Sequence, residues 1–151
     1  MVGVIADTHG LLRPEALAAL AGADVIIHAG DVGSPEVIER LRAIAPTFVV
    51  RGNNDTASWA DDLPEIQVVT VGGLRFWVLH EAARLSVDPV AAGLACVVSG
   101  HSHRPSIETR DGVLHINPGS AGPRRFTLPV TVARLRVAGD RIVPEIIQLP
   151  V

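Results

Sequence analysis

Three short apolar runs in the first third of the chain constrain the fold more than any other feature. They read VGVIA from Val2, DVIIHAGD from Asp24 and TFVV from Thr47. A short continuous apolar run is typical of a strand that is covered on both faces. Between the runs, Pro14 to Ala21 and Ser34 to Ile44 each place a proline where a helix would start. This β-α-β-α-β order predicts a parallel sheet with right-handed crossovers.

The second half of the chain has a different pattern, in which strands are joined as hairpins by Gly-containing turns. A further apolar run from Ala95 predicts one more buried strand, and Asp88 to Gly93 is at most a short helix. The predicted hairpin strands are Glu65 to Val71 with Leu74 to Leu79, Ile107 to Arg110 with Val113 to Asn117, and Thr131 to Val137 with Arg141 to Gln148. We therefore expect one mixed α/β domain over residues 1–151, with two sheets packed face to face.

The composition of the chain limits which partners it can bind and in which cellular compartment we expect it. The 151 residues are enough to bury a core, and a net charge of −3 gives no basic surface for a long nucleic acid. The single cysteine, Cys96, excludes an internal disulfide and a thiolate metal cluster. The sequence has no signal-peptide pattern and no apolar stretch of membrane-spanning length. We expect a cytoplasmic protein without a membrane partner.

Polar side chains follow five of the apolar strands, at the end where open α/β sheets place ligand sites. The strand ends carry Asp7 and His9, then His28 and Asp31 around Gly30, then Asn53, Asn54 and Asp55 after Gly52, then His80, and finally His101 and His103. Imidazole nitrogens and carboxylate or amide oxygens bind Mn, Fe, Co, Ni or Zn. A carboxylate such as Asp31 can bridge two cations, which would clamp a phosphoryl group and lower the pKa of a water molecule.

Each of these motifs is weak by itself, and two histidines have a simpler interpretation. His28 and His115 lie inside apolar strands, so we expect both to be hydrogen-bonded structural residues. Asn117 to Ser120 has the composition of an ordinary Asn-Pro-Gly turn. The ordered set of strand-end residues is far more specific than any one of its members.

The order DTH, GD, GNND, LH and SGHSH resembles the signature of the calcineurin-like metallophosphoesterase superfamily. HINPGSAGPRRF and VVTVGGLRFWVLH resemble its small branch of YfcE-type phosphodiesterases. The resemblance covers nearly the whole chain. It implies a four-layer α-β-β-α sandwich of two mixed sheets flanked by helices, with metals at the strand ends.

The resemblance also implies a ligand set for two divalent metal ions. One ion would be held by Asp7, His9 and His103, the other by Asn53, His80 and His101, with Asp31 bridging both. Mn²⁺ is the expected metal, and Fe, Co, Ni or Zn would also fit. A hydroxide bridging the two metals would then attack a phosphodiester.

Asp31, Asn54 and Asp55 are the predicted catalytic residues, with Asp55 also a candidate to orient the ligands. Larger relatives carry a histidine, thought to assist the leaving group, at the position of Asn54. Asn54 cannot titrate, so activated leaving groups should react best. A second departure is Glu81, which either adds negative charge beside the second metal or points into solvent. Arg124 and Arg125 either contact substrate phosphate or lie on the surface.

The sequence therefore predicts a metal-dependent phosphodiesterase that acts on a small diester. A phosphomonoesterase or a nuclease on the same site is the nearest alternative. The other is a catalytically silent scaffold, like the phosphoesterase-like retromer subunit, which shares the fold but has lost ligand types that this chain keeps. Family members often form dimers or larger assemblies, which leaves homo-oligomerisation open.

Overall fold

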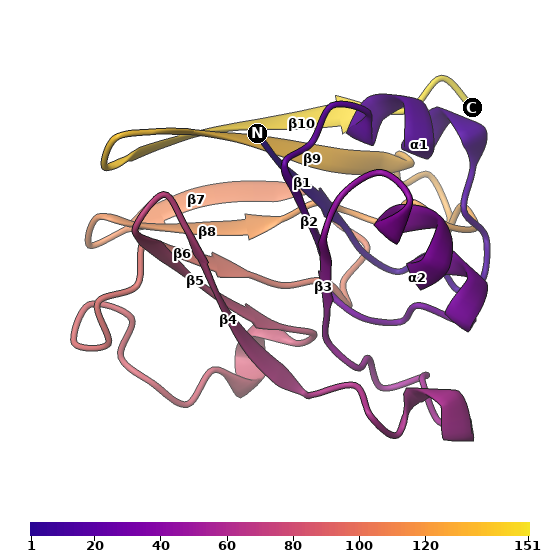
Figure 1. Ribbon diagram of the computed structural model, residues 1–151, viewed down its shortest axis with the longest axis horizontal. Coiled ribbons are helices and arrows are strands. Elements are labelled where there is room, and N and C mark those ends of the chain that lie inside the picture. The colour runs from indigo at the N-terminus through magenta and orange to yellow at the C-terminus, as the bar shows by residue number, and fades with distance from the viewer.

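Two five-stranded mixed sheets pack face to face in the computed structural model, which describes residues 1–151 (Figure 1). The strands of the first sheet, in spatial order, are β10 (Arg141–Gln148), β9 (Thr131–Ala138), β1 (Val2–Ile5), β2 (Val25–His28) and β3 (Thr47–Val49). Those of the second are β4 (Ile66–Val71), β5 (Leu74–Leu79), β6 (Cys96–Val98), β8 (Val113–Asn117) and β7 (Ser106–Arg110). The pairs β1–β2, β2–β3, β5–β6 and β6–β8 are parallel, and the others are antiparallel.

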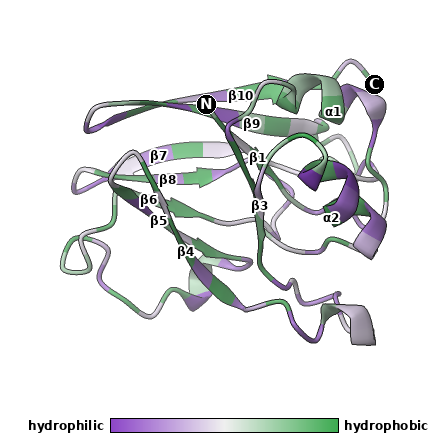
Figure 2. Ribbon diagram, in the orientation of Figure 1, coloured by the Kyte–Doolittle hydropathy of each residue, from purple (hydrophilic) through white to green (hydrophobic).

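Two helices, α1 (Pro14–Leu20) and α2 (Pro35–Arg42), cover the outer face of the first sheet. Each begins with a proline in its first turn, as the sequence predicts, although the side chain of Ser34 makes no capping hydrogen bond to α2. Figure 2 shows α2 largely in hydrophilic colours, and only one stripe of it is buried. That stripe packs against β3 and joins the core cluster that also holds Ile5 of β1 and Ile26 of β2.

The main core lies between the two sheets and follows from alternation along the strands. Val2 and Val4 of β1 face the second sheet, where they join Phe76, Val78 and Val98. Ile5, one position later, faces the helices instead. All of these side chains are buried, and each contributes about 1.5–3 kcal/mol of hydrophobic stabilisation.

The outer face of the second sheet has a thinner cover. The 3-10 helix η2 (Ala82–Arg84) and the chain that follows it pack over β6 and β8 through residues such as Leu85 and Leu94. The segment from Asp88 to Gly93, where we predicted at most a short helix, is a series of turns, because the Asp88 side chain accepts from the amides of Val90 and Ala91. A second 3-10 helix, η1 (Ser58–Ala60), lies between β3 and β4.

The predicted fold class, a metallophosphoesterase-like sandwich of two mixed sheets, is confirmed. Of the two helical layers implied by α-β-β-α, only the one on the first sheet consists of α-helices, because the 3-10 helix η2 and turns cover the second sheet. Predicted and observed element ends differ by no more than two residues; α2, for example, ends at Arg42 and not at Ile44. No helix has the length and apolar character needed to cross a membrane. The parallel strands of each sheet direct their carboxyl ends to one rim of the sandwich, which is where the seven predicted metal ligands lie.

Candidate metal centre

Seven side chains from five strand ends meet at this rim. They are Asp7 and His9 after β1, Asp31 after β2, Asn53 after β3, His80 after β5, and His101 and His103 after β6. Asp31 Oδ2 lies 3.3 Å from His80 Nε2 and 3.8 Å from His9 Nε2. His101 Nδ1 lies 3.2 Å from Asn53 Oδ1. The seven residues that the sequence proposed as ligands therefore form one continuous cluster.

Asp7 lies at the middle of this cluster. Its Oδ1 is 3.6 Å from His103 Nε2 on one side and 3.9 Å from His80 Nε2 on the other. Potential ligand atoms lie within 4.8 Å of one another in two groups, one of Asp7, His9 and His103 and one of Asp7, Asp31 and His80. The resemblance assigned Asp7 to the first ion only, whereas the structure puts it between both groups.

The donor atoms of the cluster fit divalent cations. Asp7 Oδ1 is buried and has no hydrogen-bond partner. Two pairs of imidazole nitrogens face each other, His9 Nε2 with His103 Nε2 at 3.5 Å and His80 Nε2 with His101 Nδ1 at 3.3 Å. Lone pairs at these separations repel unless a proton or a cation lies between them. Mixed imidazole and carboxylate donors suit a divalent first-row metal.

The backbone is strained at most of these ligands. Seven residues other than glycine have a positive φ, and five of them belong to the cluster: Asp7 (54°), His9 (46°), Asp31 (55°), His101 (72°) and His103 (63°). Residues held in this left-handed region are disfavoured by about 1 kcal/mol or more each, and such strain concentrates at functional sites. Backbone hydrogen bonds hold the turns, including the amide of Asp7 to the Gly30 carbonyl at 3.0 Å.

Close backbone packing brings the loops after β1, β2 and β3 together. A Cβ on Gly33, whose φ is +92°, would lie 2.1 Å from the amide nitrogen of Gly10. A Cβ on Gly52 would lie 2.1 Å from both the amide nitrogen and Oδ1 of Asp31. Only glycine permits these approaches.

Asp55 ties two of these loops together. Its carboxylate accepts hydrogen bonds from the amides of Val32 (3.1 Å), Gly33 (3.1 Å) and Gly52 (2.9 Å). Both oxygens are thus occupied by backbone donors and the residue is buried. The structure favours the orienting role suggested for Asp55 over the catalytic one.

Asn54 holds the central carboxylate of Asp31. Its backbone amide donates to Asp31 Oδ1 at 2.9 Å, and its side-chain Nδ2 donates to Oδ2 at 3.2 Å. Asn54 therefore holds both oxygens of the predicted bridging ligand, one through its backbone and the other through its side chain.

His28 has the structural role predicted for it. Its Nδ1 accepts from the amide of Gly30 at 3.1 Å, so the proton of the neutral ring lies on Nε2, which faces Thr8 Oγ1 at 3.0 Å. The Thr8 hydroxyl in turn donates to the carbonyl of Val32 at 2.7 Å. This buried chain of bonds fixes the residue between Asp7 and His9. No hydrogen bond supports the same interpretation of His115, which is partly exposed on β8.

Two further residues support the centre, and both lie in the Asn117–Ser120 motif, which has the composition of an ordinary turn. Asn117 Nδ2 donates to the Gly100 carbonyl at 2.9 Å and to Ser102 Oγ at 3.1 Å, next to His101. Ser120 Oγ donates to the carbonyl of Asp7 at 3.0 Å. Their sequence signal is weak, because Asn-Pro-Gly-Ser is common in turns that have no such function.

The charges of the cluster are strongly coupled. Burial raises the pKa of Asp7 to about 7, although the positive charge of His80 opposes this. Burial also acts to raise the pKa of Asp31, but hydrogen bonds from His80 and the Asn54 amide lower it to about 2. Burial lowers the pKa of His80, yet its hydrogen bonds with Asp31 and the Ala29 carbonyl outweigh this and the pKa is raised. The contact between His80 and Asp31 therefore favours the charged form of each side chain.

The two candidate arginines differ. Arg124 donates to the carbonyl of Val151 at 2.8 Å, which places it against the C-terminus. Burial, followed by the positive charge of Arg125, lowers the pKa of His103 to about 4. The field of Arg125 thus reaches the cluster on its His103 side.

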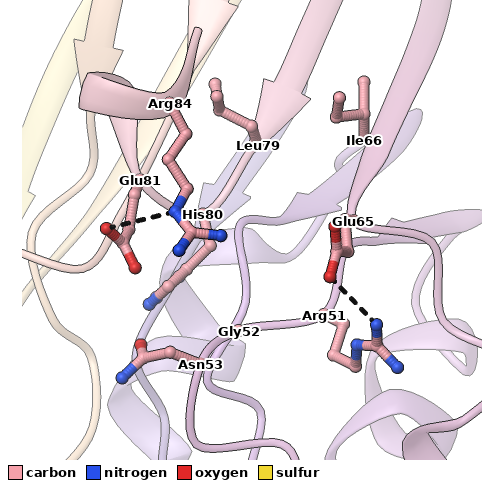
Figure 3. Close-up of a pocket in the computed structure, with 9 residues that line it drawn as sticks. All are labelled: Arg51, Gly52, Asn53, Glu65, Ile66, Leu79, His80, Glu81 and Arg84. Carbon is pink, nitrogen blue, oxygen red and sulfur yellow. Dashed lines mark hydrogen bonds and ion pairs between the residues drawn. The ribbon is translucent and has the colours of Figure 1, made fainter.

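A cavity of about 270 Å³ adjoins the other side of the cluster (Figure 3). Asn53 and His80 line it together with Glu81. Glu81 lies 3.9 Å from Arg84, and its side chain is 27% exposed. Of the two orientations that the sequence left open for Glu81, the structure has the one beside the cluster.

Residues 1–140 match the calcineurin-like phosphoesterase superfamily domain. The chain belongs to this superfamily. It is 31% identical over 160 residues to a probable metallophosphoesterase of Methanothermobacter thermautotrophicus, which covers 98% of this chain and 92% of that protein. It is 28% identical over 137 residues to a phosphodiesterase of Methanocaldococcus jannaschii, covering 78% and 82% of the two chains.

Solved structures show the same architecture. Vacuolar protein sorting 29 of Cryptosporidium parvum superposes with a TM-score of 0.84 at 23% identity, over 98% of this chain and 90% of that one. An archaeal phosphodiesterase superposes with a TM-score of 0.78 at 25% identity, over 97% and 99%. The YfcE phosphoesterase of E. coli gives 0.66 at 25% identity, over 87% and 86%. The resemblance to the small YfcE-type branch is therefore confirmed.

Proposed function

We propose that this phosphoesterase-family chain is a metal-dependent phosphodiesterase of small diesters that uses two divalent cations. The observation that carries the proposal is the buried Oδ1 of Asp7, which has no hydrogen-bond partner and lies between His103 and His80. An unpartnered carboxylate oxygen is costly to bury, and a cation bound to it would offset that cost.

The ligands divide between the two cations as the family resemblance implies. Asp7, His9 and His103 would hold one and Asn53, His80 and His101 the other, with Asp31 shared. Bound there, the cations would lower the pKa of a water molecule and neutralise charge on the phosphoryl oxygens. Mn²⁺ is our first choice because carboxylate and amide oxygens supply much of the set, and Fe, Co, Ni or Zn would suit the imidazoles.

The chain's own residues position these ligands, and Asn54, which cannot titrate, gives the leaving group no proton. Nδ1 of His80 donates to the Ala29 carbonyl at 2.7 Å, and this bond directs Nε2 of the same ring at Asp31. Asn54 uses its backbone and side-chain donors on Asp31. We therefore expect esters of acidic alcohols and phenols to react much faster than alkyl esters.

A diester is favoured over a monoester by the relatives that are described as phosphodiesterases. The test is hydrolysis of bis-p-nitrophenyl phosphate beside p-nitrophenyl phosphate, in chelator and with added Mn²⁺. We expect Mn²⁺-dependent turnover of the diester that Asp31→Ala abolishes. Asp140→Ala, which removes the same charge from an exposed turn, should retain it.

Two other results would change the assignment. Faster turnover of the monoester would make the protein a phosphatase. Tight binding of Mn²⁺ without turnover of any ester, with every divalent metal tried, would refute the catalytic proposal. It would favour an interaction scaffold with the architecture shared by vacuolar protein sorting 29.

A further inference from the structure

The cavity beside the candidate metal centre has the form of a slot with two different ends. Asn53 and His80, both proposed ligands of the same cation, form one end (Figure 3). Leu79 and Ile66, which supply its only apolar lining, lie at the other end. A group attached to a phosphate at the metal centre would extend along this slot toward the apolar end.

Each side wall of the slot is an Arg–Glu pair. On one side, Arg84 Nε lies 3.9 Å from Glu81 Oε2. On the other, Arg51 Nη2 donates to Glu65 Oε1 at 3.0 Å. Figure 3 shows the two pairs on opposite sides of the slot, with His80 and Asn53 on the side of the Arg84–Glu81 pair. The walls thus present two guanidinium groups and two carboxylates, and neither sign of charge is in excess.

This balance restricts what the slot can bind well. A second phosphate or a carboxylate needs an unpaired guanidinium, and a quaternary ammonium group needs an unpaired carboxylate or an aromatic cage. None of the nine lining residues is Phe, Tyr or Trp. The slot suits an uncharged group better. Its carboxylates can accept hydrogen bonds from hydroxyls, and its guanidinium groups can donate to carbonyls and stack on planar rings. Its apolar end can cover the face of a ring.

We propose that this slot selects phosphodiesters whose non-reacting ester group is an uncharged nucleoside, and that the pairing of Arg84 and Arg51 excludes charged headgroups. The proposal rests on the proposed phosphodiesterase function, because it concerns the group that the reacting phosphate carries. The base would lie against Ile66, which is 42% exposed, while the buried Leu79 closes that end of the slot. The sugar hydroxyls would lie near the carboxylates.

Two chromogenic esters test this, the p-nitrophenyl esters of thymidine 5′-phosphate and of phosphorylcholine. In each, water adds to phosphorus, the bond to the aryl oxygen breaks, and the products are p-nitrophenol and the retained phosphate monoester. Because the leaving group is shared, the ratio of the two kcat/KM values reports on the retained group. We expect the Mn²⁺-loaded protein to favour the thymidine ester at least tenfold.

Changing the walls should change this ratio in a defined direction. Arg84→Gln frees Glu81 and Arg51→Gln frees Glu65, so each should shift the ratio about fivefold toward the choline ester, as an added charge at a solvated surface does. Arg110→Gln is the matched control: it breaks the Arg110–Glu108 pair of β7 (3.4 Å) and removes the same charge away from the slot. We expect the control to keep the wild-type ratio.

The outcomes separate the two proposals. Hydrolysis of bis-p-nitrophenyl phosphate with the same ester ratio in wild type and both wall variants overturns this inference and leaves the phosphodiesterase in place. A ratio that moves as much in Arg110→Gln also overturns it, since net charge then explains the effect. If methyl p-nitrophenyl phosphate has the same kcat/KM as the thymidine ester, the slot does not recognise a nucleoside and the inference is overturned. Absence of any diesterase activity overturns both proposals.

Discussion

Replacing Asp55 tests whether the metal centre depends on the hydrogen bonds by which this carboxylate joins the loops after β2 and β3. The carboxylate holds three amides, of which those of Val32 and Gly52 belong to buried residues and that of Gly33 to an exposed one. In Asp55→Ala both buried donors lose their partner at about 1–3 kcal/mol each, so the free energy of unfolding should fall by about 4 kcal/mol. In Asp55→Asn the amide oxygen can keep both buried donors while water serves Gly33, and the loss should be about 1–2 kcal/mol.

The same three hydrogen bonds of Asp55 position two proposed ligands, so a variant that loses stability should also lose affinity for Mn²⁺. Urea unfolding of the metal-free variants measures the stability change, and calorimetric titration with Mn²⁺ measures affinity. We expect Asp55→Ala to weaken Mn²⁺ binding at least tenfold, because Asp31 and Asn53 lose their fixed separation, and Asp55→Asn to weaken it by no more than about threefold. An Asp55→Ala protein with unchanged stability and Mn²⁺ affinity but a large loss of kcat would refute this argument and make Asp55 a catalytic residue.

Three further substitutions test the electrostatics and packing of the centre. The folded-state pKa of Asp7 is raised to about 7, so burying its charge lowers stability progressively above the model-compound pKa of 3.8 and fully above pH 7. Asp7→Asn should therefore stabilise the metal-free protein by about 2 kcal/mol at pH 8 in urea unfolding, yet abolish the rise in Tm on adding Mn²⁺. Burial lowers the pKa of His28 from 6.5 to about 3, so the unfolded chain takes up this proton first. The stability from His28 is present above pH 6.5 and lost toward pH 3, and the difference in unfolding free energy between wild type and His28→Asn should shrink over that range. Gly52→Ala would place a Cβ 2.1 Å from Asp31 Oδ1, so calorimetry should find Mn²⁺ affinity reduced at least tenfold, while Gly73→Ala, with open space around it, should leave the affinity unchanged.

Much of the fold could be predicted because its strands carry strong local patterns. The run from Val2 is apolar at every position since it is covered by helices on one face and by the second sheet on the other. The hairpins at Gly72-Gly73 and Asp111-Gly112 form where the sequence placed them. The order of strands within a sheet has no comparable local signal. That β9 pairs with β1 and carries β10 to the edge is set by packing between distant segments.

The membership of the candidate site could be predicted, but much of its support could not. The ligand positions follow from which residue types stand at strand ends. The left-handed backbone at Asp7 or His101 could not be predicted from the sequence, because Asp and His, although enriched in this region, adopt other conformations far more often. The role of Asp55 was also hidden: a buried carboxylate that binds three amides and one that takes part in catalysis look the same in GNND. Only the placement of Val32 and Gly52 around it separates the two.

The strain at the ligands and the burial of Asp7 have a common explanation. Five left-handed ligands, at about 1 kcal/mol or more each, together approach the total stability of a small domain, which is about 5–15 kcal/mol. The fold holds them in place with bonds that serve little else, such as Asp55 to the loop amides and Ser120 to the carbonyl of Asp7. A chain with no use for the arrangement would gain stability by relaxing it. Cations that bind only the folded state would raise its stability by mass action and so offset the free energy lost to this strain. The strain is thus a physical argument, independent of sequence similarity, that this rim of the sandwich is built to hold metal.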